Sequence, residues 1–403
     1  MLIRKEVAFT IKKLLAFWNV RNCVLFIDFI ASFSFYLFIP YLATYFSESK
    51  GYSVSFIGGV LAIRIIAQQG LAIWGGLLAD RLGYKTMALI GFVIRGLGFI
   101  GMGYASNGGA LIASAALSGL GGAFFSPALR ATIAYYSTPE KQKEAYGLMN
   151  MVENAGAVLG PMFGMFLYHV PFDRLSILTG GLFLIMSLFY IRIPSIPVVD
   201  GHARWFTQIS YIMKDKQFMF IFFGMIPFYF IHQQLYLSLP IVANSYTGSS
   251  NWIFPVVTIL IIFFQMPFIK LIEKKRTTSI FFLSYLCMAL LFIPLSIVPN
   301  LFSILLCLMG ISLGTMILLP SYQAISVRSA PNGLVAAYLG FSTIAMAIGG
   351  TLGNIFGGAL FDYFISINQQ YLFWICISLL SLFPVIVICA RKIKIHYQLK
   401  EKV

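Results

Sequence analysis

The most constraining feature of this sequence is a series of twelve long apolar segments separated by short polar turns. A helix needs about 20 apolar residues to cross the hydrocarbon core of a bilayer. With 59% hydrophobic and only 10% charged residues in 403, the chain does not suit a soluble globular domain. We therefore predict an all-α membrane protein with twelve transmembrane helices, placed at 22–45, 55–79, 86–105, 110–135, 144–168, 175–193, 218–245, 251–271, 278–298, 300–323, 333–360 and 370–390.

The charged residues are distributed unevenly along the chain. The net charge is +15, and 24 of the 28 Lys and Arg residues fall at the two ends or in alternate connections. The other connections hold only Lys50 and Arg174, while Arg64 and Arg95 lie inside apolar segments. Basic loops stay in the cytoplasm, so the pattern predicts a multi-pass protein of the cell membrane with both termini cytoplasmic. We expect that membrane to be bacterial. The basic excess is then explained by topology, and we expect the lipid bilayer, and no nucleic acid, as its partner.

The lengths of the connections suggest the domain organisation. Only 194–217 is long enough to join two domains, and the basic start of the chain is typical of an interfacial helix, not of a cleaved signal peptide. The predicted parts are an N-terminal cytoplasmic or interfacial segment (1–21), a six-helix bundle (22–193), a cytoplasmic linker (194–217), a second six-helix bundle (218–390) and a basic tail (391–403).

The second half repeats landmarks of the first. The glycines at 156, 160 and 164 return at 349, 353 and 357, a displacement of 193. Tyr36 and Pro40 also match Tyr236 and Pro240. Two pseudo-symmetric six-helix bundles are typical of transporters whose substrate site lies between the halves at the middle of the membrane.

The repeat fails wherever the first half carries an intramembrane charge. The four such residues and their second-half counterparts are Asp28 and Phe228, Arg64 and Val257, Arg95 and Met288, and Glu153 and Met346. A charge at the bilayer centre costs a few kcal/mol or more and is seldom kept without a partner or a function.

Asp28 and Glu153 are the candidates for proton coupling. A carboxyl group in a low-dielectric cavity can bind a proton at one face of the membrane and release it at the other. The alternative is that the acids form structural pairs with the arginines, for example Asp28 with Arg64 and Glu153 with Arg95. Both interpretations remain open at the level of sequence.

A short charged turn separates the second and third apolar segments. It reads Gly76-Leu-Leu-Ala-Asp80-Arg81-Leu-Gly83-Tyr-Lys85, and its basic residues place it in the cytoplasm. Asp80 precedes the next helix, whose N-terminal N–H groups would favour a carboxylate. The turn resembles the G-x-L-A-D-R-x-G-x-K signature of the major facilitator superfamily. The resemblance implies the twelve-helix fold of that family and a conformational latch formed by this turn.

A second motif resembles one branch of that superfamily. Gly156-xxx-Gly160-Pro161-xx-Gly164 is similar to the antiporter signature of the drug:proton antiporters. Pro161 removes a helix hydrogen bond and favours a kink. Arg64-xxx-Gln68-Gln69-Gly70 and Ser118-Gly-Leu-Gly-Gly122 look most like the MdtH-like multidrug exporters. The branch has an arginine where this chain has Ala115, so Arg64 or Arg95 is the expected substitute.

Uncharged polar and aromatic side chains are the candidates for substrate binding. They suit a broad pocket for organic solutes, and the alternative for each is a hydrogen bond between helices. His232 has no second histidine or cysteine nearby, so no metal site is expected. The candidates are Ser32, Tyr36, Gln68, Tyr229, His232, Gln233, Tyr236, Gln265, Tyr322 and Gln323.

The sequence thus favours a secondary transporter that exports a drug-like solute or metabolite in exchange for protons by alternating access. Alternatives are a proton symporter or uniporter, or an exporter of an anionic metabolite such as a carboxylate-rich siderophore, which the arginines would suit. A membrane-embedded enzyme would need clustered histidines or a nucleophile with its base, and neither pattern occurs. We expect no cofactor, a small organic substrate and protons as partners, and a monomer.

Overall fold

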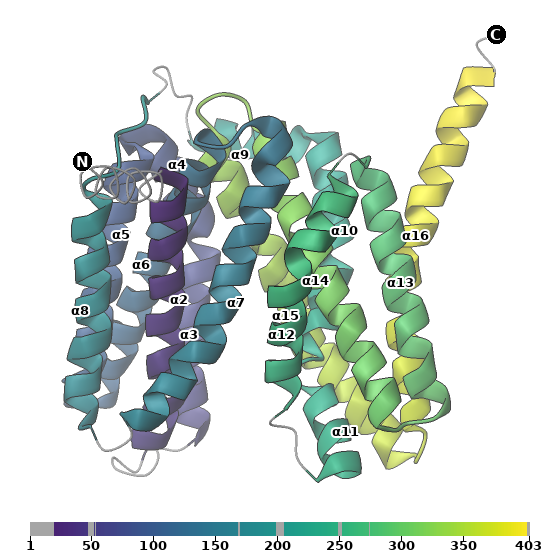
Figure 1. Ribbon diagram of the computed structural model, residues 1–403, viewed down its shortest axis with the longest axis horizontal. Helices are drawn as coiled ribbons and strands as arrows, with labels where there is room; N and C mark the ends of the chain where they lie inside the picture. The colour runs from purple at the N-terminus through teal and green to yellow at the C-terminus, as the bar shows by residue number, and fades with distance from the viewer. Residues whose placement is uncertain are drawn as a thin grey trace, which may run out of the picture. The chain divides into compact units, whose positions relative to one another are not determined.

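The computed structural model describes residues 20–46, 52, 54–167, 170–198, 205–248, 252–273 and 275–400. Nearly all of these residues are helical (Figure 1). The predicted interfacial segment, apart from its last two residues, and Lys50 lie outside the described residues.

The chain divides into two compact units. The first comprises Met1–Gln208 together with Ser326–Phe341, and the second comprises Ile209–Ile325 and Ser342–Val403. The helices of the first unit are α2 (Val20–Thr44), α3 (Val54–Gly70), α4 (Ala72–Leu82), α5 (Tyr84–Gly103), α6 (Gly108–Tyr135), the short η2 (Pro139–Lys141), α7 (Gln142–Phe166) and α8 (Phe172–Tyr190).

A short helix, α9 (Trp205–Lys214), lies at the boundary and was not expected in the linker. The second unit contains α10 (Lys216–Gln233), α11 (Ser238–Thr247), α12 (Ile253–Ile272), α13 (Thr277–Ile297), most of α14 (Leu301–Ser329), most of α15 (Val335–Ser366) and α16 (Gln370–Lys400). The end of α14, the start of α15 and the turn between them pack with the first unit.

Each predicted segment corresponds to one helix or to one broken pair of helices. Ten described helices are long and apolar enough to cross a membrane, or eleven if the bent pair α3 and α4 forms one span. That pair bends by 42° at the break that follows Gly70. Among the described helices, α7 has the length but is not one of these, because Asn150, Glu153 and Asn154 interrupt its apolar character.

Glycines on α7 let α2 pack directly against it, and the two helices run side by side in Figure 1. A Cβ atom at Gly156 would lie 2.7 Å from the backbone nitrogen of Phe33, and one at Gly160 would lie 2.7 Å from its oxygen. Any side chain at these positions would push α2 away. The small-residue stripe seen in the sequence therefore sets the α2–α7 contact.

The same arrangement recurs between α15 and α10 in the second unit. A Cβ atom at Gly349 would lie 2.5 Å from the backbone oxygen of Ile226 and 2.7 Å from Cβ of Tyr229. At Gly156 the corresponding neighbours are the oxygen of Phe29 and Cβ of Ser32. The displacement from 29 to 226, and from 32 to 229, is 197.

By sequence, Tyr36 matches Tyr236, a displacement of 200. The packing of α10 gives a displacement of 197, so that match is three residues out of register for this helix. The break between α10 and α11 accommodates the difference, since Gln234–Leu237 lie outside both helices. The counterpart of Asp28 at a displacement of 197 is Met225, not Phe228. Met225 is apolar as well, so the charge asymmetry between the halves stands.

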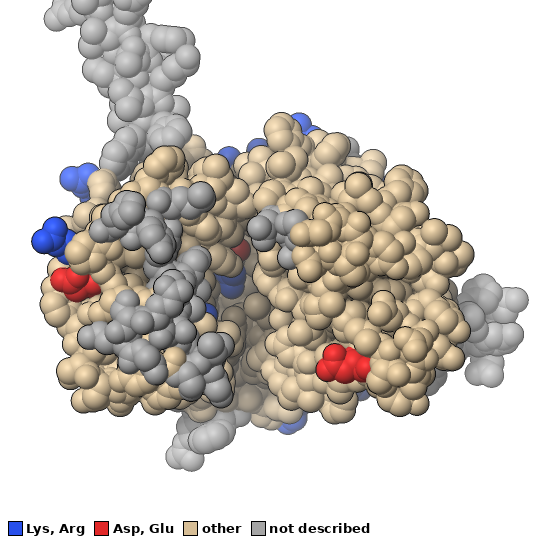
Figure 2. All heavy atoms as spheres, turned by 90° about the horizontal axis from the view of Figure 1, so that it is seen from below, with Lys and Arg blue, Asp and Glu red and all other residues tan. Residues whose placement is uncertain are grey.

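The surface of the helices is apolar over wide areas. Large side chains such as Phe263 (70% exposed), Phe302 (68%) and Ile386 (64%) face outward. Figure 2 shows one face of the molecule, on which the described surface is almost entirely uncharged with a few scattered acidic and basic groups. Such a surface needs lipid in place of water.

Candidate functional site

Two carboxyl groups meet inside the first unit. Asp28 on α2 is 5% exposed, and the side chain of Glu153 on α7 is 33% exposed. The two carboxyl groups are near enough to interact electrostatically. No N–H or O–H group of the described residues donates to Asp28 Oδ2. Two neighbouring carboxyl groups can hydrogen-bond to each other only when they hold a proton between them.

The α2–α7 contact brings the acids together. Glu153 precedes Gly156 by about one helical turn, and Asp28 precedes Ser32 by about one turn. Because Ser32 lies against Gly156, the residues one turn earlier on each helix are also neighbours.

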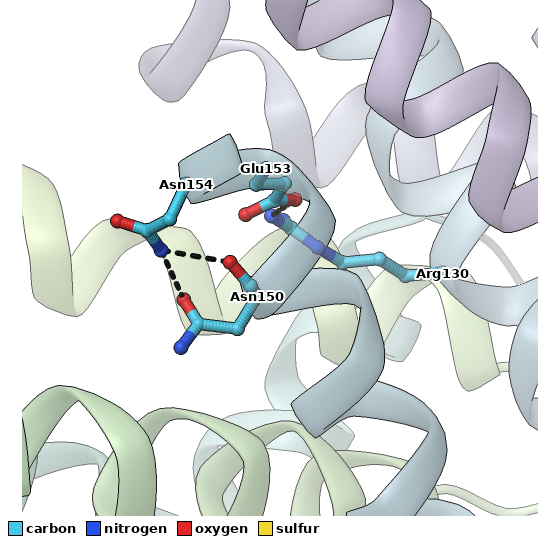
Figure 3. Close-up of polar contacts among 4 residues, drawn as sticks. All are labelled: Arg130, Asn150, Glu153 and Asn154. Carbon is cyan, nitrogen blue, oxygen red and sulfur yellow. Dashed lines mark hydrogen bonds and ion pairs between the residues drawn. The ribbon is translucent and has the colours of Figure 1, made fainter. Parts of the chain in front are cut away.

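A third charged group, Arg130 on α6, completes this cluster. Its Nη2 atom donates to Glu153 Oε1 at 3.3 Å, which makes an ion pair (Figure 3). The suggested Glu153–Arg95 pair is therefore wrong. Arg130 is also one of the 24 basic residues that the sequence analysis counted at the chain ends or in the connections, and that count is wrong for it, because α6 extends to Tyr135. The predicted 110–135 segment already enclosed Arg130, and that signal was overlooked.

Asn150 and Asn154 form a polar patch beside Glu153 on α7. The Nδ2 atom of Asn154 donates to the backbone oxygen of Asn150 at 2.7 Å and to its Oδ1 at 3.2 Å. In Figure 3 these two amides lie to one side, while Glu153 is directed toward Arg130. The polar face of α7 was not recognised from the sequence beyond Glu153.

Arg64 and Arg95 form a second cluster around Gln68. The Nη1 atom of Arg64 donates to Gln68 Oε1 at 3.0 Å, and the Nη1 atom of Arg95 donates to the same oxygen at 3.3 Å. Arg64 is 9% exposed and Arg95 is 4% exposed. The suggested Asp28–Arg64 pair is therefore also wrong. Like charges at ~4 Å repel by about 4 kcal/mol at an effective dielectric constant of ~20, so one shared amide oxygen does not neutralise this pair.

Aromatic rings surround both guanidinium groups. The Cζ atoms of Arg64 and Arg95 lie 4.6 and 5.2 Å from the centre of the Phe35 ring. Cζ of Arg95 also lies 5.3–5.7 Å from the rings of Phe99, Phe125 and Phe183. Cation–π contacts of this kind partly offset the loss of hydration.

The glycine-rich stretch of α6 makes room for this cluster. A Cβ atom at Gly122 would lie 2.3 Å from Arg95 Nη1 and 2.8 Å from Gln68 Cδ. One at Gly119 would lie 2.3 Å from the backbone oxygen of Arg64. The motif thus allows α3 and α6 to approach closely and leaves space for the Arg95 guanidinium.

Tyr36 lies between the two clusters. It interacts electrostatically with Glu153 on one side and with Arg64 and Arg95 on the other. Tyr36 is 37% exposed, although Arg64 and Arg95 are buried. Within the described residues, Glu153–Arg130 is the one ion pair, so no carboxylate lies within 4 Å of Arg64 or Arg95.

Asp80 binds the N-terminus of α15. Its Oδ1 accepts from the backbone N–H of Ala336 at 3.1 Å, and its Oδ2 accepts from that of Ala337 at 2.8 Å. The Tyr84 hydroxyl donates to Oδ1 at 3.0 Å. The expectation that Asp80 serves the next helix in sequence, α5, is wrong, since Gly83 caps α5 without a side-chain bond. The reason for an acid here is correct, because the start of α15 supplies the free N–H groups.

Glycines allow the backbones of α4 and α15 to touch. A Cβ atom at Gly76 would lie 2.2 Å from the backbone oxygen of Ala336, and one at Gly340 would lie 2.3 Å from that of Ala72. Gly83 adopts a φ of 91°, which suits glycine in the tight turn between α4 and α5. Arg81 and Lys85 flank this turn and are half-buried.

Two of the second-half candidates are used to join helices. The Nε2 atom of the fully buried Gln265 donates to the backbone oxygen of Met316 at 2.8 Å. The Tyr322 hydroxyl, 1% exposed, donates to that of Ser342 at 3.2 Å. Both contacts are hydrogen bonds between helices, which the sequence analysis gave as the alternative to substrate binding for these residues. Gln234, next to the candidate Gln233, joins the end of α10 to α15 by donating from Nε2 to Gly353 O at 3.1 Å.

The remaining second-half candidates are more accessible. Tyr229, His232, Gln233 and Gln323 are half-buried, and Tyr236 is 52% exposed. The centre of the His232 ring lies 5.6 Å from the centre of the Phe228 ring and 5.8 Å from that of the Tyr236 ring. Among the described residues, no group of three or more His, Cys, Asp or Glu side chains is arranged to hold a metal.

Comparison with known proteins identifies the family. Residues 24–354 match the profile of the Major Facilitator Superfamily. This chain belongs to the major facilitator superfamily. Its fold is accordingly that of two six-helix halves, and its family is one of transporters, not enzymes.

Relatives and solved structures extend this assignment. Multidrug resistance protein MdtH of Salmonella paratyphi B is 31% identical over 360 residues, covering 86% of this chain and 88% of that protein. The MdtH of Salmonella typhimurium shows the same identity and coverage. The predicted resemblance to MdtH-like exporters of this superfamily is confirmed.

The E. coli fucose:proton symporter FucP has a similar fold, with a TM-score of 0.75 at 14% identity, covering 92% of this chain and 97% of that one. The human organic anion transporter MFSD10 has a TM-score of 0.69 at 14% identity, covering 92% and 98%.

Proposed function

We propose that this major facilitator protein exports an organic solute in exchange for protons. The observation that carries the proposal is the contact between Asp28 and Glu153, beside the ion pair of Glu153 with Arg130. The relatives named as multidrug resistance proteins support export as the direction.

The carboxyl pair supplies a site for one transported proton. When the pair holds a proton, Asp28 and Glu153 share a hydrogen bond. When the proton leaves, two like charges remain in a site of low dielectric constant, and Arg130 is the cation that offsets them. Protonation thus changes the attraction between α7 and α6, and the Gly156–Phe33 contact transmits any shift of α7 to α2.

The Asp80 contact supplies the conformational control. The two hydrogen bonds hold the start of α15 on α4, while the rest of α15 belongs to the second unit. We assign these bonds to one of the two access states and expect them to break in the other. The turn Gly76–Lys85 is then the latch.

The direction of transport requires an orientation. We place both termini in the cytoplasm, because all but a few of the basic residues fall at the chain ends or in alternate connections. The Asp80 turn is cytoplasmic in this arrangement.

Flux into and out of proteoliposomes under an imposed pH gradient tests the proposal. With a panel of drug-like cations and organic acids, we expect solute to move against the direction of proton flow. We expect Asp28→Asn or Glu153→Gln, or both, to lose gradient-driven flux while still reaching the membrane. Matched controls are Asp173→Asn at the start of α8 and Glu144→Gln on α7 itself. Normal pumping by both cluster variants, or movement of solute together with protons, would contradict antiport through this pair.

A further inference from the structure

We propose that Arg64 and Arg95 bind the negatively charged group of the transported solute, which is therefore an organic anion with an aromatic or planar body. This inference rests on the proposed function as a solute exporter, but it does not require the proton site to be correct.

The positive charges of Arg64 and Arg95 are not balanced by nearby acids in the described part of the chain. The Asp28 cluster and the Gln68 cluster together hold two acids, Asp28 and Glu153, and three arginines, Arg64, Arg95 and Arg130, and Arg130 forms the ion pair with Glu153. Arg64 and Arg95 lie within 4 Å of no carboxylate of the described residues. Their shared acceptor, Gln68, is neutral. A buried cation normally has a counter-charge, so this pair has the electrostatic character of an anion site.

The two guanidinium groups share one hydrogen-bond acceptor. Both Nη1 atoms bind one oxygen, so the guanidinium groups converge on a single point. The Nε atoms of both side chains are buried without a hydrogen-bond partner among the described residues. Guanidinium groups present a planar fork that matches the oxygens of carboxylate, sulfonate or phosphate. The two guanidinium groups converge and keep N–H donors unused within the described part of the chain, and an anionic group with several oxygens needs donors in this arrangement.

Aromatic and polar side chains surround the arginine pair. The ring of Phe35 faces both guanidinium groups, and Tyr36 beside it is 37% exposed. Gln68 is half-buried. The pair is therefore closed on the Arg95 side by aromatic rings, and Gln68 and Tyr36 are its more exposed neighbours. An anion with an attached aromatic ring would fill this edge with both charge and apolar surface.

The opposing view is that the arginines only hold α3 and α5 together through Gln68. A single neutral acceptor is a poor means to that end, because it leaves two like charges adjacent. Gly122 further shows that space is kept for Arg95, since a methyl group there would collide with its guanidinium.

The test measures equilibrium binding to the purified full-length protein, with no pH gradient. The probes are 2-naphthoate, 2-naphthamide and 2-naphthylmethylammonium, which share a ring system and differ in charge. We expect 2-naphthoate to bind saturably and at least tenfold more tightly than the other two. Equal affinities, or no saturable binding of 2-naphthoate, would overturn the proposal.

The decisive variant is Gln68→Glu, which places a tethered carboxylate between the two guanidinium groups. It is nearly isosteric and adds attraction, so we expect it to fold with a raised melting temperature. We expect 2-naphthoate affinity to fall at least tenfold, and less than threefold in the control Gln69→Glu, one residue along α3. Unchanged 2-naphthoate binding by Gln68→Glu would assign the arginines to structure alone.

Two measurements separate this site from the proton site. Saturable, charge-selective binding of 2-naphthoate without gradient-driven flux would remove only the proposed proton exchange. Gradient-driven flux with equal affinities for the three probes would remove only the anion site.

Discussion

Glu153 Oε1 lies 3.3 Å from Arg130 Nη2, so the acid on α7 is paired with a base on α6. The Glu153 side chain is 33% exposed and the Arg130 side chain is 20% exposed, so solvent reaches the ion pair but screens it only in part. Arginine and carboxylate attract each other only while the carboxylate is charged, so protonation of Glu153 would remove this attraction between α6 and α7.

Replacing Arg130 should uncouple solute movement from protons. In Arg130→Gln the ionised form of Glu153 loses its cation, so proton release becomes less favourable. We expect gradient-driven flux in proteoliposomes to fall at least tenfold while solute exchange without a gradient persists. Arg130→Lys keeps the charge and should be intermediate. Full pumping by Arg130→Gln would show that the ion pair is not part of the proton path.

Replacing Asp80 should release the start of α15. Hydrogen bonds to charged groups contribute about 1.5–3 kcal/mol each, and Asn has one acceptor oxygen where Asp has two. In Asp80→Asn we expect amide hydrogen exchange at Ala336 and Ala337 to accelerate about tenfold, with slower turnover and retained solute binding. Tyr84→Phe removes one bond to Asp80 and should have a smaller effect. Unchanged exchange and turnover in Asp80→Asn would remove the latch assignment.

A methyl group at Gly76 should have the same consequence for a steric reason. Its Cβ would lie 2.2 Å from the backbone oxygen of Ala336, and rotation of a side chain cannot relieve a contact between backbones. We expect Gly76→Ala to accelerate amide exchange at the start of α15 at least as much as Asp80→Asn does. Gly181→Ala on α8 is the control, because no heavy atom lies within 4 Å of its Cβ position. Equal exchange in both variants would contradict close packing of α4 on α15.

Gln265 should matter for stability and not for solute recognition. It is fully buried and its amide bonds α14. We expect Gln265→Leu to lower stability by about 1–3 kcal/mol, the cost of leaving a buried carbonyl unpaired, with unchanged solute affinity. Gln323→Leu, at a half-buried position, is the contrast and should change affinity with little loss of stability. A large affinity change in Gln265→Leu would return that residue to the binding site.

The sequence predicted the helices well because each apolar segment has to satisfy its own backbone hydrogen bonds within lipid. It was less informative where a helix departs from that rule. The break at Gln234–Leu237 shifted the register of the repeat by three residues. The segment 144–168 was predicted as an apolar span and corresponds to α7, although Asn150 and Glu153 make α7 more polar than the other spans.

The site was predicted in its parts and not in its pairings. Asp28, Glu153, Arg64 and Arg95 were recognised as costly charges in an apolar setting. Their partners were not, because the packing of α2, α3, α5, α6 and α7 decides which side chains meet. The partners of Asp80 lie 256 and 257 residues away, where no local pattern indicates a contact.

The acceptor role of Asp80 has a consequence for inherited variation. Its partners on α15 are peptide groups, which every amino acid except proline supplies equally. A random screen for defective closure should therefore recover lesions on the α4 side of this junction, and on the α15 side chiefly prolines or residues too bulky for the crossing at Gly340. Sequence drift could exchange Ala336 and Ala337 for other small residues without leaving a trace in such a screen, because both are fully buried and only their peptide groups bind Asp80.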